Sequence, residues 1–316
     1  MAINLARFSH DGRIGWGVVR ADRISPLAGA YSSTAALIAD GEADFRAATQ
    51  RPATIGLQDV TLLSPATAPC RVYCQGANYR QHMIESGMNP DEKAFNMFFT
   101  KSDASIASAV DTVMRPAHVR LLDYEIELGL VFRKPIASAT VVTKENLKDY
   151  VFGITIANDL SARDVQLPQT QFFKGKSYRG FCPLGPWLTV LEGDEFGQLD
   201  NLQLLLAVNG QTRQKDTTAN LVFKPAETIS ELSTFANVMP GDLLLTGTPS
   251  GCALRVPPPL VRKTLQLLPD RKFWKLFGKA QARRPHYLQP GDRISARIRS
   301  DDGRIDLGEQ KTLIAG

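Results

Sequence analysis

The run at residues 123–131 constrains this chain most, because it carries two carboxylates two positions apart within an otherwise apolar stretch. Side chains alternate between the faces of an extended strand, so Glu125 and Glu127 are expected to point to the same side. Two buried like charges repel each other and lose hydration, so they need a cation, Arg or Lys side chains, or a shared proton nearby. A bound divalent metal ion meets that need most simply. The alternative is an edge strand whose polar face meets water.

The length of the chain allows a large hydrophobic core and predicts one large domain with one small one. We place a small N-terminal domain at residues 1–68, with short strands followed by a helical patch near 33–49, and a catalytic domain at 69–316. No apolar run approaches the length of a membrane span, and the N-terminus lacks a signal-peptide pattern. These features predict a cytoplasmic protein without a membrane partner. The four cysteines lack zinc-site spacing, so we expect reduced, packed thiols.

The net charge of +5 arises from one segment, residues 252–290, which holds nine Lys and Arg against a single Asp. The rest of the chain is slightly acidic, so the charge does not indicate nucleic-acid binding. Within this insertion Phe273, Leu276 and Phe277 have helical spacing against a basic face. Three interpretations stay open: a helix on an anionic membrane surface, a contact with a dimer partner, or a wall over the active-site mouth. Because the insertion follows directly on Thr248, we favour the wall or the dimer contact.

His82 and Glu85 lie three positions apart in a stretch that can form one or two helical turns after a short strand at 72–75. That spacing puts both side chains on one helical face, where the carboxylate can orient the imidazole and stabilise its protonated form. The pair therefore has the outline of a general base. The alternative is an ordinary contact on a helix surface.

Asp159 follows a near-continuous apolar strand at 151–157, which makes it a natural third metal ligand. The alternative is that Asp159 caps the next turn and pairs with Arg163. Residues 165–182 are expected to form a polar functional loop. The small residues at 246–251, after a strand at 243–245, allow the backbone to approach a ligand closely.

From about residue 72 to residue 314 the chain resembles the fumarylacetoacetate hydrolase family, in its acylpyruvate hydrolase-like and 2-hydroxyhepta-2,4-diene-1,7-dioate isomerase-like branch. The resemblance rests on NYRQHMIE, DYEIELGLVF, GITIANDLSARDVQ, GKSYRGFCPLGPW, a hairpin followed by Gln214, and PGDLLLTGTPSG. It implies an α+β, mostly β fold, the mixed β-roll, and a homodimer. It also implies one Mg²⁺ or Mn²⁺ per subunit, held by Glu125, Glu127 and Asp159, since three carboxylates suit a hard cation.

The resemblance also implies roles for further residues. His82 and Glu85 would activate water, and Lys176 would neutralise developing charge. The positions implied to bind substrate are Tyr79, Arg163, Gln166 and Thr248. The insertion at 252–290 departs from the compact members of the family, so the size of the substrate does not carry over.

The activity implied by these residues is metal-dependent hydrolysis of a carbon–carbon bond in a small anionic acylpyruvate, a 2,4-diketo acid, in the catabolism of aromatic compounds. A 2-keto carboxylate can chelate the metal, which stabilises the enolate formed when the bond breaks. Hydration, decarboxylation or isomerisation of a 2-keto or 2-hydroxy-dienoate through the same enolate is the first alternative. A metal-dependent keto-acid binder without turnover is the second.

Overall fold

Strand β11 (Ile126–Phe132) lies at the centre of the structure, a computed structural model that describes residues 2–256 and 268–316. It pairs antiparallel with β12 (Val151–Asn158) on one side and with β18 (Leu243–Leu245) on the other. Every residue of β11 and β12 is buried. The edge-strand alternative for the two glutamates is therefore wrong, because the strand has neighbours on both sides.

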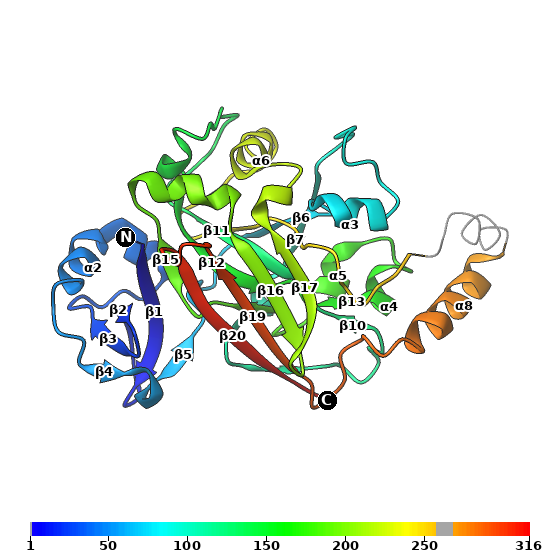
Figure 1. Ribbon diagram of the computed structural model, residues 1–316, viewed down its shortest axis with the longest axis horizontal. Coiled ribbons are helices and arrows are strands. Elements are labelled where there is room, and N and C mark those ends of the chain that lie inside the picture. Colours follow the sequence, from blue (N-terminus) through cyan, green and yellow to red (C-terminus); the bar gives the residue numbers. More distant parts are fainter. Residues whose placement is uncertain (1, 257–267) are drawn as a thin grey trace.

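Thirteen strands of the described residues form one mixed sheet, in the order β4-β3-β2-β1-β15-β12-β11-β18-β6-β7, with β5, β8 and β14 joined to its side (Figure 1). Only the pairs β18–β6 and β14–β8 among these described strands are parallel. The other strands of this sheet are β1 (Ile3–His10), β2 (Arg13–Arg20), β3 (Arg23–Pro26), β4 (Ile55–Gly56), β5 (Thr61–Leu63), β6 (Val72–Gly76), β7 (Met97–Lys101), β8 (Ile106–Ser108), β14 (Cys182–Leu184) and β15 (Leu188–Val190).

A second sheet of five strands, ordered β17-β16-β19-β20-β9, lies against the central strands. Its members are β9 (Thr112–Met114), β16 (Gln203–Val208), β17 (Gln211–Thr217), β19 (Arg293–Arg299) and β20 (Asp306–Ala315). A two-stranded ladder joins β10 (Leu122–Asp123) to β13 (Ser161–Ala162). The main core fills the space between the two larger sheets, where Leu128 and Ile154 share one apolar cluster with Leu204 and Ile294.

A second core covers the opposite face of the large sheet. It includes Trp16, Phe45, Val131 and Phe152, and helices α1 (Thr34–Asp40) and α2 (Glu42–Ala48) contribute to it. Val131 belongs to this core while its neighbours on β11 belong to the other, as alternation along a strand requires. Strand β1 bonds to both β2 and β15, so the N-terminal strands continue the large sheet. A domain boundary at residue 68 stays a prediction.

Four further helices of the described residues are short. They are α3 (Arg80–Glu85), α4 (Arg163–Gln166), α5 (Phe172–Lys176) and α6 (Pro225–Leu232), with the 3₁₀ turns η1 (Leu57–Asp59), η2 (Asp103–Ser105), η3 (Leu147–Asp149), η4 (Gly193–Asp200) and η5 (Thr218–Asn220). The loop expected at 165–182 therefore contains a helix. Tertiary contacts stabilise α5, because Phe172 packs edge-on against Phe99 at 5.1 Å and Gly175 lies close to Gln166.

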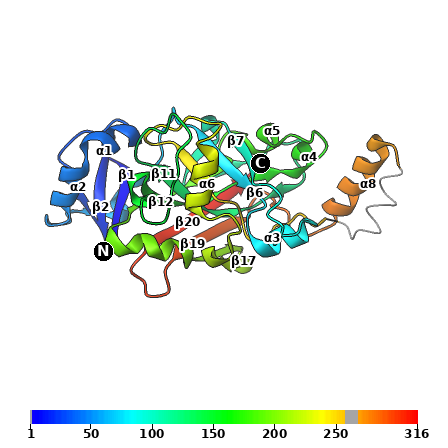
Figure 2. The same cartoon turned by 90° about the horizontal axis from the view of Figure 1, so that it is seen from above.

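Helix α8 (Asp270–Ala282) confirms the helical spacing within the insertion. Figures 1 and 2 both show it extending from the end of the molecule opposite the N-terminal strands. Phe273 and Phe277 stack on each other at 6.0 Å, and Phe277 is buried. Residues 257–267 of the insertion lie outside the described residues. Across the described ranges, no helix combines the length and apolar character needed to cross a bilayer.

Candidate metal centre and active site

Three carboxylates meet where β11 begins and β12 ends. Glu125 precedes β11, Glu127 lies on it, and Asp159 follows β12; one ligand atom from each lies within 4.8 Å of the others. The antiparallel pairing of β11 with β12 brings these positions together, and the Asp159 N–H donates to the Glu125 carbonyl at 2.8 Å. All three side chains are buried. The residues grouped from sequence as metal ligands are therefore neighbours in space.

Buried basic side chains compensate part of this negative charge. The Lys176 ammonium lies 2.7 Å from a Glu125 oxygen and 2.5 Å from an Asp159 oxygen. Lys101 donates to the other Asp159 oxygen at 2.5 Å. Arg163 binds Glu125 and lies 2.9 Å from Asp123. The alternative of an Asp159–Arg163 pair is thus wrong, since Arg163 is taken up by two other carboxylates.

Glu127 is the carboxyl group of the cluster that none of these three bases contacts. Its carboxylate accepts the Gly247 N–H at 2.7 Å. Burial, followed by the charges of Asp159 and Glu125, raises the pKa of Glu127 well above its usual range. Burial also disfavours the charged form of Glu125, but Arg163 and Lys176 outweigh it and hold the Glu125 pKa well below its usual range.

This charge imbalance fits a divalent cation. Four buried acids of the described site face only three buried bases, which are Lys101, Arg163 and Lys176. A cation beside Glu127 would offset the burial and the repulsion that raise the pKa of that carboxyl group. Three carboxylate donors without His or Cys suit Mg²⁺ or Mn²⁺ better than zinc.

Gly247 is required by the backbone next to this cluster. Its φ of +87° lies in the left-handed region, and an added Cβ would come within 2.9 Å of the Asn78 Cβ. Its N–H can therefore point at Glu127. At Gly247, the small residue expected in this turn allows the backbone to approach Glu127, a predicted metal ligand.

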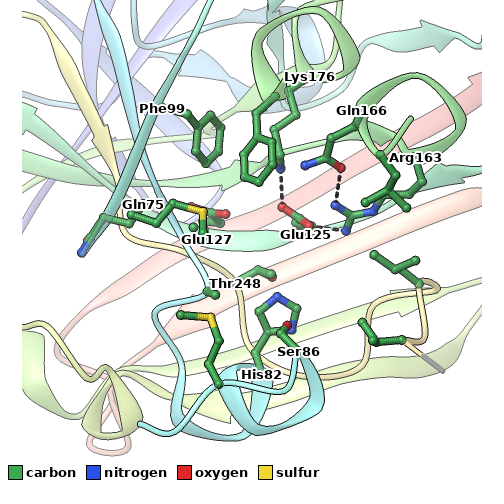
Figure 3. A pocket seen from close by; sticks show the side chains of 18 residues that line it. Gln75, His82, Ser86, Phe99, Glu125, Glu127, Arg163, Gln166, Lys176 and Thr248 are labelled. Atoms are coloured by element: carbon green, nitrogen blue, oxygen red, sulfur yellow. Dashed lines mark hydrogen bonds and ion pairs between the residues drawn. The ribbon is translucent and has the colours of Figure 1, made fainter. Parts of the chain in front are cut away.

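A cavity of about 280 Å³ opens onto the carboxylate cluster. Figure 3 shows His82 of α3 and Ser86, which follows that helix, on the opposite side of this pocket from Lys176 and Phe99. Thr248 lies between them. The pocket brings together seven of the residues singled out from sequence: His82, Glu125, Glu127, Arg163, Gln166, Lys176 and Thr248.

His82 is placed to act as a base. Its ring is half-buried, and its Nδ1 is buried without a hydrogen-bond partner among the described residues. Burial, together with the charge of Arg163, lowers the pKa of His82 despite the opposing charge of Glu125. The imidazole is therefore neutral near pH 7 and can accept a proton.

Glu85 makes a different contact from the one expected. Its carboxylate forms an ion pair with Arg255 at 2.7 Å. No hydrogen bond joins it to His82 in the described structure. Arg255 belongs to the insertion, whose position relative to α3 could not be read from local spacing. The His82–Glu85 dyad stays a prediction.

Tyr79 does not lie where the resemblance implied. Its side chain is fully buried in the main core and is not among those that line the pocket. The residue immediately precedes α3, and its backbone bridges to Leu221. This arrangement fixes the aromatic ring on the core side of the chain, so the expected substrate contact is corrected.

Two charged residues of the site were not identified from sequence. Lys101 ends β7, and Asp123 opens the run that carries the two glutamates. Asp123 accepts from the backbone N–H groups of Ala253 and Leu254 as well as from Arg163. Both residues are charged and lie at the edge of an apolar run, which could have indicated a buried site residue. The same pattern is also typical of exposed strand ends, so it did not single them out.

Lys101→Met is expected to destabilise the fold by about 3–5 kcal/mol, because it removes one partner from a fully buried ion pair and leaves Asp159 undercompensated. Urea unfolding of the metal-free protein measures this change. Lys93→Met is the matched control, since Lys93 pairs with Glu227 at a half-exposed position and should alter the midpoint very little. Equal midpoints for the two variants would contradict the structural role of Lys101.

Comparison with known families identifies the class of protein. Residues 71–314 match the family described as fumarylacetoacetate (FAA) hydrolase, C-terminal. Residues 4–65 match the family described as Rv2993c-like, N-terminal. The chain therefore belongs to the fumarylacetoacetate hydrolase family, and the predicted α+β, mostly β fold is confirmed.

Individual relatives carry out different reactions. The chain is 38% identical over 205 residues to oxaloacetate tautomerase YisK of Bacillus subtilis (strain 168), across 64% of this chain and 66% of that protein, or about two thirds of its length. It also resembles a probable 2-hydroxyhepta-2,4-diene-1,7-dioate isomerase from Mycobacterium abscessus, with 29% identity, a TM-score of 0.74 and coverage of 100% and 98% of the two chains.

A third similar structure is described with ligands. It is maleylpyruvate hydrolase from Sphingobium sp. SYK-6 in complex with manganese(II) ion and pyruvate, which is 25% identical with a TM-score of 0.72 over 99% of this chain and 98% of that one. Tautomerase, isomerase and hydrolase are thus all represented among the relatives. Family membership alone does not decide the reaction.

Proposed function

We propose that this chain is a Mg²⁺- or Mn²⁺-dependent enzyme that hydrolyses the carbon–carbon bond of an acylpyruvate. One observation carries the proposal: Glu125 and Glu127 of the buried three-carboxylate cluster line one pocket together with His82, whose pKa is lowered by burial. Glu125, Glu127 and Asp159 would hold one cation per subunit. When bound, that cation would supply the positive charge that stabilises an enolate of the pyruvate unit.

The proton transfers fall to His82. Its neutral imidazole would take a proton from water, whose oxygen then adds to the carbonyl carbon of the acyl group. The bond between this carbon and C3 of the pyruvate unit breaks, and its electron pair stays on C3. The imidazolium returns its proton to C3, so the products are a carboxylic acid and pyruvate. No further co-reactant is required.

Lys176 is held in one position for this chemistry. Its ammonium donates to Glu125, to Asp159 and to the Ser161 hydroxyl, and it lies 5.0 Å from the centre of the Phe99 ring. A cation fixed by several partners needs little reorganisation when negative charge develops on a substrate. Lys176 therefore supports the enolate from the side of the pocket opposite His82.

The direct test is turnover of acetylpyruvate, followed by the release of pyruvate, with Mg²⁺ or Mn²⁺ added to metal-depleted protein. We expect hydrolysis that depends on the cation and stops with an excess of EDTA. Pyruvate release that is unaffected by EDTA would contradict a metal-dependent reaction, and its complete absence with both cations would contradict the hydrolase.

Keto–enol tautomerisation of oxaloacetate is the second candidate. The relative from Bacillus subtilis bears this name, and the Glu85–Arg255 ion pair leaves His82 as a single base without a carboxylate partner. Moving one proton at C3 requires no attacking water. Acceleration of the decay of enol-oxaloacetate, without pyruvate release from acetylpyruvate, would favour this candidate. Turnover of a 2-hydroxy-dienoate or decarboxylation of oxaloacetate would instead indicate hydratase, isomerase or decarboxylase activity, and keto-acid binding without any turnover would indicate a silent binder.

The wider setting of the protein stays a prediction. All four cysteines are unpaired, and burial raises the pKa of the Cys182 thiol to about 12, in keeping with the reduced thiols expected in the cytoplasm. The homodimer and the role in aromatic catabolism are implied by the resemblance. Size-exclusion chromatography with light scattering would test the dimer.

A further inference from the structure

Residues 253–256, which we call the strap, begin the insertion and are fixed by hydrogen bonds to several elements. The Ala253 and Leu254 N–H groups donate to the two oxygens of Asp123 at 2.7 and 3.0 Å. Gln281 of α8 donates to the Arg255 carbonyl at 2.8 Å. Asp123 also binds Arg163, which in turn binds Glu125. The strap is thus tied to the carboxylate cluster on one side and to α8 on the other.

The side chain of Arg255 fixes the strap to the opposite side of the pocket. Its guanidinium pairs with Glu85 at 2.7 Å, and Glu85 lies on the same short helix as His82. This contact places the strap beside α3, the helix that carries the expected base. No described residue of α8 lines the pocket, so among the described residues of the insertion it is the strap that reaches it.

The strap contributes two apolar side chains to the pocket. Leu254 and Val256 line the cavity that is also lined by His82, Glu125 and Glu127. Val256 is still 37% exposed, so a bound apolar group can bury more of it. Six other apolar side chains line the same cavity: Ala77, Met88, Met97, Phe99, Leu167 and Phe172. Part of the pocket wall is therefore built to contact hydrocarbon.

The cationic side chains of the pocket are already occupied. Arg163 and Lys176 are the Arg and Lys residues among its described lining, and both bind Glu125. A second carboxylate on the substrate would lose hydration without gaining a free cation among these residues. The pocket accordingly distinguishes a keto acid with an apolar tail from a keto diacid.

We propose that the strap determines substrate specificity, with Leu254 and Val256 contacting an apolar group on the far side of a 2-keto acid and disfavouring a second carboxylate there. The inference rests on the proposed function in one respect, namely that the pyruvate unit binds at the carboxylate cluster. It extends that function by naming the substrate class. Each methylene group buried on binding strengthens affinity by about fourfold.

The test compares two stable keto acids of similar shape by calorimetry with the Mg²⁺-loaded full-length protein. 5-Methyl-2-oxohexanoate ends in two methyl groups where 2-oxoglutarate ends in a carboxylate. We expect the apolar acid to bind at least about tenfold more tightly. Leu254→Ala should weaken its binding by about tenfold and that of pyruvate by less than about twofold, because pyruvate is too short to reach the strap.

Two further variants keep the test specific. Leu254→Met conserves volume and should retain the preference, while Leu276→Ala removes a half-exposed leucine of α8 outside the pocket and should change neither affinity. The inference would be overturned if 2-oxoglutarate bound more tightly than 5-methyl-2-oxohexanoate, or if neither of these two acids bound. It would also be overturned if Leu254→Ala weakened the binding of 5-methyl-2-oxohexanoate and of pyruvate equally. Failure to hydrolyse acetylpyruvate with the binding preference intact would instead reject only the proposed reaction.

Discussion

Glu127→Gln is expected to lower the affinity for Mg²⁺ or Mn²⁺ by at least about 100-fold and to abolish metal-dependent turnover. The substitution keeps the shape of the side chain but removes one of the three carboxylate charges of the cluster. In the absence of metal, the same substitution should stabilise the fold. Burial beside Asp159 and Glu125 raises the pKa of Glu127, so a neutral amide at this position relieves repulsion. Calorimetric titration with each cation and thermal unfolding without metal measure the two effects.

Glu125→Gln provides the contrast. It should also weaken cation binding, but it leaves Arg163 and Lys176 without a shared buried partner, and removing one side of such a contact destabilises by about 3–5 kcal/mol. Both substitutions should therefore weaken cation binding, but Glu127→Gln should stabilise the metal-free fold whereas Glu125→Gln should destabilise it, although the two residues lie two positions apart. Unchanged cation affinity in both variants would show that the cluster does not hold the metal.

His82→Ala is expected to reduce kcat for acylpyruvate hydrolysis by about 10²–10⁴-fold, the usual contribution of a general base. Binding of the cation and of oxalate, which mimics the pyruvate enolate, should stay within about twofold because the carboxylates hold both. Ser86→Ala is the matched control, since Ser86 lines the same pocket from the end of α3 but carries no titrating base. Stopped assays for pyruvate and calorimetry with oxalate measure the separation.

The pH profile provides a second measurement of the same role. His82 acts in its neutral form, and activity is lost as pH falls through its pKa. Because burial lowers this pKa, the acid limb of kcat/KM should lie below the ordinary histidine value of about 6.5. Hydrolysis at the wild-type rate in His82→Ala, or an acid limb that persists unchanged in it, would remove His82 as the base.

Local pattern was enough to predict several parts of this protein. The period of two along a strand placed Glu125 and Glu127 together, and the apolar strand before Asp159 marked it as a third ligand. Helical spacing predicted α8, and the ordered motifs indicated the family before the family comparison confirmed it. Residue types, spacings and the order of motifs are read along the chain, although it is the pairing of β11 with β12 that brings Asp159 to the two glutamates.

Other parts depended on which distant segments pack together. Residue spacing suggested a partner for Glu85 three positions away, but folding places Arg255 of the insertion beside it. Tyr79 lies next to the site helix in sequence, yet backbone pairing with Leu221 places its ring in the core. A side chain can contact either a neighbour in sequence or a residue of a distant element, and the packing of the elements decides which contact forms.

The sequence by itself thus determined the acidic cluster, the family and the helical character of the insertion. Tertiary structure alone decided how the cluster is neutralised and what surrounds it. Lys101 reaches Asp159 from β7, and Asp123 links Arg163 to the strap. Charge compensation acts through space at a few ångströms, whereas the residues involved are separated by 58 positions for Lys101 and 130 for Ala253. Only the pairing of the central strands and the course of the insertion bring them within that range.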